Sequence, residues 1–286
     1  MFTQHSQIPV QHEAVIKPDT YFNVGEQFDK YLAHSMQPEI DKIFRELVIK
    51  NGPVHRLLDV GCASGRTSVF TKSLGVKELV GVEIDERAVK IARNYMDCVI
   101  HADVNETELN YPDDYFDMIF FTDILEHLVD PWKVLQKITR YLCKGGFALI
   151  SLPNIGHIEV IRRMLTVSLR YNERGLMDSG HLRIFTQNMA TEMIQRAGLK
   201  IERMVYRMDK ASWAKYKHTD TIPLLPNIGT LYVNPAVVPP ALRRTYFVRK
   251  FHILASRPFV QQDTTTYQNF DHFLKESDED ELVFSS

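Results

Sequence analysis

Three carboxylates in the first half of the chain are spaced as if they belonged to one site. Asp59 lies in a short apolar run, Glu83 ends a second run, and Asp103 follows a third. A carboxylate about 20 residues after the first turn of an α/β unit can accept hydrogen bonds from both hydroxyls of a ribose. We expect Asp103, which follows the next run, to reach an adenine amino group.

A turn that carries two glycines follows Asp59, with three residues between Gly61 and Gly65. Glycines at the end of a strand let backbone N–H groups approach a ligand closely. A dinucleotide site would instead show the three glycines of G-x-G-x-x-G. Asp59 would repel a pyrophosphate, but its charge suits an ammonium or sulfonium group. The sequence therefore predicts a pocket for an adenosyl ligand without phosphates.

The three carboxylates can share a site only if the apolar runs are neighbouring strands of one sheet. Runs of strand length alternate with segments of helical periodicity along this part of the chain. Strands are expected at residues 56–60, 79–83, 98–100, 116–121 and 147–152, and helices at 67–74, 86–95 and 131–142. This alternation predicts a Rossmann-like α/β fold, a doubly wound and mostly parallel sheet with helices on both faces.

The rest of the chain is expected to surround this sheet. Helical spacing over residues 28–49 predicts an N-terminal helical cover that Pro38 divides, and the proline-rich segment 208–240 is predicted to be a lid-like loop. Further elements are expected as a helix at 187–197 and strands at 200–206 and 243–255. The chain is predicted to begin with a loose arm at residues 1–20 and to form one domain over residues 21–260. Residues 261–286 are predicted to be an acidic, disordered tail.

The composition is that of an ordinary globular protein. The 286 residues include 34 Lys and Arg against 36 Asp and Glu, a formal charge of −2, so nucleic acid is not an expected partner. Cys62, Cys98 and Cys143 show no paired spacing, which argues against a disulfide framework or a thiolate zinc site. No apolar run is long enough to span a bilayer, and residues 1–12 lack the layout of a signal peptide. These features predict a cytoplasmic location.

With these motifs, residues 21–255 resemble the class I S-adenosylmethionine-dependent methyltransferases. Residues 59–65 match the first motif of that family, and residues 123–128 match the motif after its fourth strand. Ala63 stands where many relatives have glycine. The resemblance implies S-adenosylmethionine as cofactor, S-adenosylhomocysteine as product and an EC 2.1.1 activity. The implied cofactor-binding residues are Tyr21, Asp59, Gly61, Ala63, Gly65, Glu83, Ile84, Asp103, Val104 and Asp123.

Two segments after the fifth predicted strand should line the acceptor cleft, because ligands of open α/β sheets bind beyond the carboxyl ends of the strands. Residues 151–157 and 175–186 resemble segments of methyltransferases from glycan, cell-surface polysaccharide and natural-product pathways, which commonly modify sugar hydroxyls. We predict an O-methyltransferase that acts on a hydroxyl of a sugar, glycan or related small metabolite. The predicted catalytic residues are His181, His157 and Asp178. The predicted substrate contacts are Asn154 and Tyr171.

A hydroxyl acceptor must lose its proton as the methyl group arrives, and an imidazole titrates near neutral pH. His181 is the preferred base because Asp178 precedes it closely enough to orient the ring. The alternative is structural: Asp178 and His181 would cap and pin a helix, and His157 would be a surface residue. Two rival functions stay open, N-methylation of an amine and a catalytically silent S-adenosylmethionine-binding partner subunit.

A divalent metal is not expected, although one resemblance keeps it open. Some ubiquinone-pathway and small-RNA ribose methyltransferases hold a cation with an acid-x-x-Glu-His element, joined in the RNA enzymes by a further histidine. By that resemblance the metal ligands would be Asp123, Glu126, His127 and His181. In relatives that bind no metal, the histidine of this element more often packs and hydrogen-bonds beneath the cofactor.

A local basic cluster lies near the last predicted strand. Its members are Arg243, Arg244, Arg249 and Lys250. A nucleotide- or phosphate-bearing acceptor is one interpretation of this cluster, and a solvated strand face is the simpler one.

Overall fold

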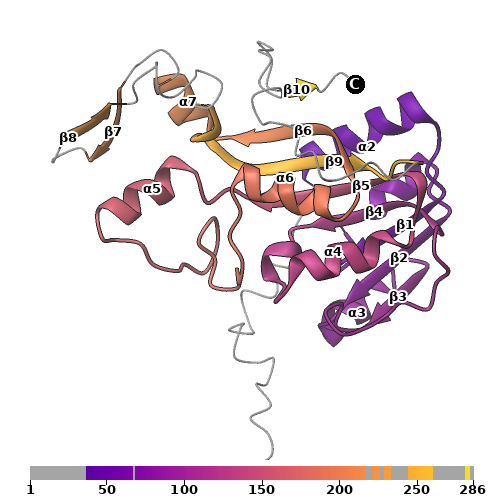
Figure 1. The fold of residues 1–286 in the computed structure, drawn as a ribbon. Coiled ribbons are helices and arrows are strands. Elements are labelled where there is room, and N and C mark those ends of the chain that lie inside the picture. Colours follow the sequence, from indigo (N-terminus) through magenta and orange to yellow (C-terminus); the bar gives the residue numbers. More distant parts are fainter. Residues whose placement is uncertain are drawn as a thin grey trace, which may run out of the picture.

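The computed structural model describes residues 37–66, 68–216, 221–225, 229–232, 244–259 and 281–283. Tyr21, the predicted N-terminal arm, the first part of the predicted helical cover and Arg243 lie outside these residues. In the described part of the chain, eight strands form one sheet in the order β10-β6-β9-β5-β4-β1-β2-β3 (Figure 1). The strands are β1 (Arg56–Val60), β2 (Glu78–Glu83), β3 (Cys98–His101), β4 (Phe116–Thr122), β5 (Leu142–Pro153), β6 (Lys200–Met208), β9 (Val248–Ser256) and β10 (Glu281–Val283).

The first five strands run parallel, and the later ones extend the sheet in the antiparallel sense. Leu58 of β1 is in register with Val80 of β2 and with Ile119 of β4, and β4 is parallel to β5. Strand β9 inserts antiparallel between β5 and β6, and β10 pairs antiparallel with β6. The predicted doubly wound, mostly parallel sheet is confirmed, so the carboxyl ends of β1 to β4 meet at one edge.

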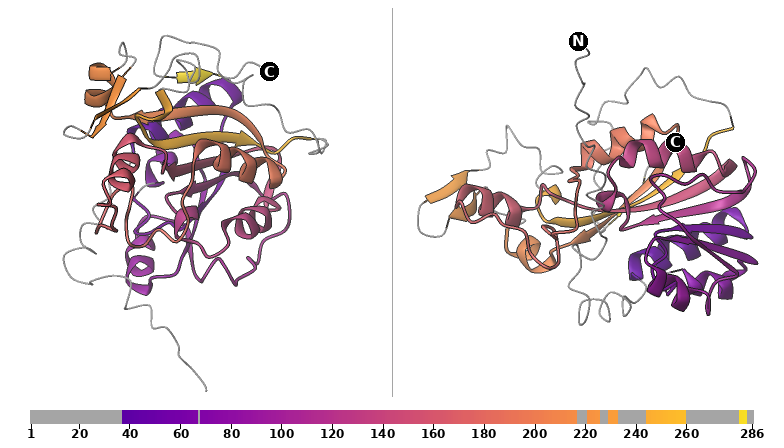
Figure 2. Two further views of the ribbon diagram at one scale, coloured as in Figure 1. Left: turned by 60° about the vertical axis from the view of Figure 1, so that its left-hand side comes forward. Right: turned by 90° about the horizontal axis from the view of Figure 1, so that it is seen from below.

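Helices lie on both faces of this sheet (Figure 1 and Figure 2). Local side-chain caps set where several of them begin: Asp85 accepts from the N–H groups of Arg87 and Ala88, and Asp130 accepts from Lys133 N. The helical segments are α2 (Pro38–Asn51), η2 (Val69–Leu74), α3 (Glu86–Ala92), η3 (Leu125–His127), α4 (Pro131–Thr139), α5 (Ile158–Leu165), α6 (Gln187–Arg196) and α7 (Lys210–Tyr216).

The alternation of side chains along the strands divides the core into two layers. Leu57 and Phe120 face a buried cluster that includes Phe44 of α2, whereas Leu58 and Ile119 face a second cluster with the apolar residues of α4 and α6. Successive strand residues point to opposite faces, so both faces of β1 and β4 are apolar. Because both faces are packed, the strand ends that carry the predicted ligand contacts are held in place.

Two predicted elements differ in the structure for local reasons. The helix expected at residues 67–74 is the short 3₁₀ helix η2, in which the Thr71 hydroxyl and N–H both donate to the Ser68 carbonyl. The strand expected from residue 243 begins only at Val248 in the described chain, because the preceding residues form a turn. That turn is pinned by the bond from Ile158 N to the Tyr246 carbonyl.

The segment predicted as a lid-like loop contains regular structure in its described part. It begins with α7, whose Trp213 and Tyr216 pack on Phe247, and continues in a hairpin of β7 (Thr221–Leu225) and β8 (Gly229–Tyr232). Figure 1 shows this hairpin projecting beside α5, away from the main sheet. Three residues of the predicted acidic tail form β10, and its other residues lie outside the described part.

Two isoleucines of α2 provide a test of this packing. Ile43 is 1% exposed beneath the sheet, whereas Ile49 on the same helix is 84% exposed. Ile43→Ala should lower the free energy of unfolding by roughly 2–5 kcal/mol, since it removes buried methyl groups and leaves a cavity. Ile49→Ala should change it by less than about 0.5 kcal/mol. Urea unfolding followed by circular dichroism measures both, and equal losses would contradict the placement of α2.

Candidate cofactor and acceptor site

The turn after β1 has the backbone geometry that its glycines permit. Gly61 and Gly65 have φ of 72° and 76°, and Ala63 between them has φ of 48°. A Cβ on Gly61 would lie 2.6 Å from Cδ1 of Ile124, which follows β4. Glycine at this position is therefore required both by the backbone conformation and by the close approach of the two loops. Ala63 adopts a left-handed conformation, which the glycine that many relatives have at this position reaches without strain.

Glu83, at the end of β2, is held by backbone N–H groups. Its Oε2 accepts from Ala63 N at 2.9 Å, and its Oε1 accepts from Ile84 N and Asp85 N at 2.8 and 2.9 Å. The residue is 5% exposed. Burial raises the pKa of its carboxyl, although the three hydrogen bonds act to lower that pKa. The carboxylate is thus fixed against the glycine turn, and its lone pairs that remain can accept ribose hydroxyls.

Asp59 is fully buried in β1, and neither carboxylate oxygen has a donor in hydrogen-bond geometry among the described residues. Burial raises its pKa to about 7; the nearby Ser68 hydroxyl opposes that shift, and the negative charge of Glu83 adds to it. A buried carboxyl without a partner is costly. A cationic ligand beside the turn would compensate it, which agrees with the predicted ammonium or sulfonium.

The adenine side is formed by the ends of β2 and β3. Ile84 is 57% exposed, so it offers an apolar surface on which a base can pack, and His101 Nε2 lies 3.0 Å from the Ile84 carbonyl. Asp103 Oδ1 accepts from the backbone and side-chain nitrogens of Asn105, each at 2.8 Å. Val104 is 6% exposed and belongs to the core, so its predicted ligand contact can involve only its backbone.

Asp123 is occupied by partners from three other parts of the chain. Its carboxylate pairs with Lys250 of β9, accepts from the Ser151 hydroxyl of β5 and accepts from Gln37 Nε2 at 2.8 Å. Burial would raise the pKa of Asp123, but Lys250 and these hydrogen bonds hold it at about 2. These contacts occupy the side chain of Asp123 in the structure, and its ligand-binding role stays a prediction. Sequence reasoning missed the Lys250 partner, since the two residues lie 127 positions apart.

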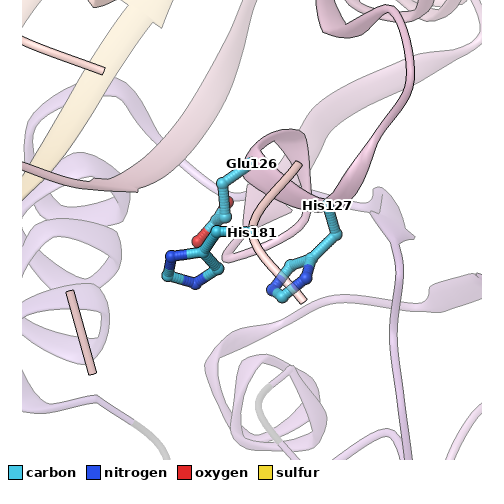
Figure 3. Close-up of side chains that lie close together, drawn as sticks. All are labelled: Glu126, His127 and His181. Carbon is cyan, nitrogen blue, oxygen red and sulfur yellow. The ribbon is translucent and has the colours of Figure 1, made fainter. Parts of the chain in front are cut away.

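Glu126, His127 and His181 form a compact group, which we call the His–Glu cluster (Figure 3). One ligand atom from each residue lies within 4.8 Å of the others. The first two belong to η3 after β4, and His181 belongs to the loop before α6. Three of the four residues of the predicted metal alternative are thus brought together, and Asp123 is the one that the Lys250 pair holds elsewhere.

Burial favours the neutral form of all three members of the His–Glu cluster. Glu126 is 1% exposed, and burial together with the nearby charge of Asp123 raises its pKa to about 8. Burial lowers the pKa of His127, although its hydrogen bond to the Gly180 carbonyl acts in the opposite direction. Burial and the neighbouring His127 lower the pKa of His181. At neutral pH both imidazoles therefore have an unprotonated nitrogen.

Asn154 and His157 are both buried and hydrogen-bonded within the protein, and their site roles stay predictions. Asn154 is 3% exposed, and its Nδ2 donates to the carbonyls of Thr245 and Val248 at 3.0 and 2.8 Å. His157 is 1% exposed and caps α5, with Nδ1 accepting from Glu159 N at 3.2 Å. Burial, with the adjacent Arg249, lowers the pKa of His157 to about 4. Both side chains join β5 to the segments around it.

Asp178 and Tyr171 lie in the predicted acceptor segments. Asp178 Oδ1 accepts from Gly180 N at 2.8 Å, so it stabilises the turn before His181. The His181 ring instead directs Nδ1 at the Leu176 carbonyl, 3.4 Å away. Asp178 therefore contacts the turn rather than the ring, and its orienting role stays a prediction. Tyr171 is 64% exposed, which leaves its ring accessible to a ligand.

The residues at the edge of the sheet fit an adenosyl group with a positively charged tail. Glu83 and Asp103 have free lone pairs for hydroxyl and amino donors, Ile84 offers an apolar face, and buried Asp59 lacks a counter-charge. The glycine turn exposes backbone rather than side chain to the ligand. The fold and these groups together fit a class I protein whose adenosyl cofactor binds at the carboxyl ends of the parallel strands.

The methyltransferase domain family matches residues 28–203, more than half of the chain. The chain belongs to this family, the S-adenosylmethionine-dependent methyltransferases. The fold is also similar to that of magnesium protoporphyrin IX methyltransferase from Synechocystis PCC 6803 with bound S-adenosylhomocysteine. The TM-score is 0.56 at 12% identity, over 86% of this chain and 100% of that one.

Two relatives with assigned names match shorter stretches. The 27-O-demethylrifamycin SV methyltransferase of Amycolatopsis mediterranei is 33% identical over 110 residues, 34% of this chain and 40% of its own length. The ubiquinone biosynthesis O-methyltransferase of Ruegeria pomeroyi is 27% identical over 171 residues, 55% of this chain and 65% of its own length. The match thus covers less than two thirds of either relative. No helix among the described residues is long and apolar enough to cross a membrane.

The ribose role of Glu83 can be tested by removing its charge. Glu83→Gln should weaken binding of S-adenosylmethionine and S-adenosylhomocysteine by about 1.5–3 kcal/mol, the scale of hydrogen bonds to a charged group. Glu86→Gln is the matched control, because that side chain is 65% exposed on the neighbouring helix. Calorimetry measures the affinities and thermal unfolding verifies the fold. An unchanged affinity in folded Glu83→Gln would remove Glu83 from this role.

The raised pKa of Asp59 predicts a pH dependence of cofactor binding. A cationic ligand favours the ionised carboxylate. Binding therefore releases a proton at any pH at which Asp59 is protonated in the free protein. Because the pKa of Asp59 is raised to about 7, affinity for S-adenosylmethionine should fall as the pH drops from about 7 towards 5, by up to about tenfold per pH unit. Asp59→Asn should flatten this slope. Calorimetry in buffers of different ionisation enthalpy counts the released protons, and none released near pH 6 would contradict the expectation.

Proposed function

We propose that this chain transfers a methyl group from S-adenosylmethionine to a hydroxyl oxygen of a sugar, glycan or related small metabolite. The observation that carries the proposal is the approach of two imidazoles, His127 after β4 and His181, whose ring centroids lie 4.9 Å apart. Burial lowers the pKa of both rings, which favours the neutral, basic form. A hydroxyl must lose a proton during methyl transfer, whereas a neutral amine is already nucleophilic. A site with basic nitrogens at this edge is therefore better suited to a hydroxyl acceptor.

The names of the two relatives support the same reaction class. One is a ubiquinone biosynthesis O-methyltransferase, and the other methylates 27-O-demethylrifamycin SV. Each name refers to transfer of a methyl group to oxygen. The exposed Tyr171 ring, in the loop that leads to His181, offers an amphipathic surface for a cyclic acceptor.

The reaction needs an in-line approach of the acceptor oxygen to the methyl carbon. Holding the two reactants in this geometry supplies much of the rate acceleration, because the sulfonium is already a good leaving group. The new carbon–oxygen bond forms as the carbon–sulfur bond breaks, and the hydroxyl proton passes to a basic nitrogen. His181 is our first choice for that nitrogen, since it lies on the loop of residues 175–186 that resembles acceptor segments.

His181→Ala tests the role of this ring in turnover. The variant should lower kcat by about 10²–10⁴-fold, the usual contribution of a positioned base, while affinity for S-adenosylhomocysteine stays unchanged. His55→Ala, at an exposed position before β1, is the matched control and should leave both unchanged. The rate is followed as S-adenosylhomocysteine release with a panel of sugars, nucleotide sugars, phenols and amines.

Product analysis separates the proposal from its rivals. Mass spectrometry and NMR of the product should place the new methyl group on oxygen. Methyl transfer to nitrogen, with kcat unaffected in His181→Ala, would favour the amine acceptor. Tight cofactor binding without turnover on any acceptor class would favour a silent partner subunit, and either result would overturn the O-methyltransferase proposal.

A further inference from the structure

We propose that Glu126, His127 and His181 bind one divalent transition-metal ion, which holds the acceptor next to the methyl donor. One nitrogen or oxygen from each residue lies within 4.8 Å of the others, so one small ion can contact all three. The residues come from η3 and from the loop before α6 (Figure 3). The proposal rests on the proposed function only for the identity of the acceptor, because ion binding can be measured without one.

The hydrogen bonds of both imidazoles leave the same ring nitrogen free. His127 Nδ1 lies 2.9 Å from the Gly180 carbonyl, which can only accept, so Nδ1 carries the proton and Nε2 has the lone pair. His181 Nδ1 lies 3.4 Å from the Leu176 carbonyl, which also can only accept. This longer contact likewise places the proton on Nδ1. A histidine that donates one N–H to a backbone carbonyl and offers the other nitrogen is the usual arrangement of a metal ligand.

Glu126 supplies the independent observation that points to a ligand. The residue is 1% exposed, and in the described part of the chain its Oε2 has no hydrogen-bond partner. A buried carboxyl oxygen without a hydrogen-bond partner is destabilising unless something compensates it. The nearby Lys250 is paired with Asp123 and makes no hydrogen bond with Glu126 Oε2. A cation between Glu126 and the two Nε2 atoms would satisfy the oxygen and both lone pairs together.

The surrounding backbone holds these side chains in fixed positions. A Cβ on Gly180 would lie only 3.2 Å from His127 Nδ1, so glycine permits the close approach of the two loops. Arg183 N donates to the Glu126 carbonyl at 3.0 Å, and Arg183 Nε donates to the Val129 carbonyl at 3.0 Å. Arg183 therefore attaches the loop that carries His181 to the chain at η3 and just after it.

The donor set selects the class of ion. Two imidazole nitrogens and one carboxylate oxygen suit Zn²⁺, Mn²⁺, Co²⁺ or Fe²⁺, whereas Mg²⁺ and Ca²⁺ prefer oxygen ligands. Three protein ligands leave coordination positions open, as in sites that bind a substrate. A hydroxyl at an open position would have a lowered pKa. With the ion bound, His181 would serve as its ligand, and water would take the hydroxyl proton in place of the free ring. An acceptor with two neighbouring oxygens, such as a vicinal diol, would occupy two such positions.

Ion binding is tested directly with Co²⁺ as the spectroscopic probe. The protein without a histidine tag is stripped with chelator and titrated with Co²⁺, then with Zn²⁺, Mn²⁺ and Mg²⁺ in competition, with S-adenosylhomocysteine present. We expect one equivalent of Co²⁺ with a visible ligand-field spectrum typical of nitrogen and oxygen ligands. Zn²⁺ should displace it, and Mg²⁺ should not.

Variants assign the site and separate it from nonspecific binding. Glu126→Gln and His181→Ala should each weaken Co²⁺ binding by more than the roughly 10–100-fold that loss of an outer partner costs, with unchanged affinity for S-adenosylhomocysteine. His55→Ala should bind Co²⁺ normally. Absence of the spectrum, or its persistence in Glu126→Gln and His181→Ala, would overturn the proposal. Full turnover of hydroxyl acceptors in excess chelator would also overturn it while leaving the O-methyltransferase function intact.

Discussion

The pairing of Asp123 with Lys250 is the interaction on which the ligand-binding edge of the sheet depends. It joins the end of β4 to β9, and the same carboxylate accepts from Ser151 of β5 and from Gln37 before α2. Burial alone would favour the protonated acid, but these partners hold its pKa at about 2. Asp123 has φ of 56°, a conformation that an aspartate tolerates better than most residues, and its contacts hold the chain there. The direction in which η3 leaves β4 follows from this anchor.

The two halves of the site are built on different physical bases. On the cofactor side, a glycine turn and three N–H groups around Glu83 make a mostly backbone surface, and desolvation raises the pKa of both Asp59 and Glu83. Such a site favours a ligand with hydroxyl donors and positive charge. On the acceptor side, side chains converge from η3 and a separate loop. Their arrangement depends on the contacts between those loops, including the approach of Gly180 to His127.

The histidines show why a shifted pKa does not by itself identify a functional group. Burial lowers the pKa of His157, His181 and His252 alike. His157 caps α5 and is enclosed by the protein, and His252 is buried against Gln37. His181 differs because one of its ring nitrogens lies within 4.8 Å of ligand atoms of Glu126 and His127. Access and convergence of lone pairs, rather than the direction of the shift, distinguish the candidate site.

The sequence by itself determined the parallel α/β class, the glycine turn, the position of Glu83 and the motif at residues 123–128, because strand periodicity, turn chemistry and the spacing of strand ends are local properties. Only the tertiary structure decided which distant groups meet. Lys250 reaches Asp123 across 127 positions, and Gly180 binds His127 across 53. Asn154 and His157 have the residue types of a site, and tertiary packing leaves both almost wholly buried. The packing of loops and the antiparallel entry of β9 determine these contacts, and no local pattern in the chain encodes them.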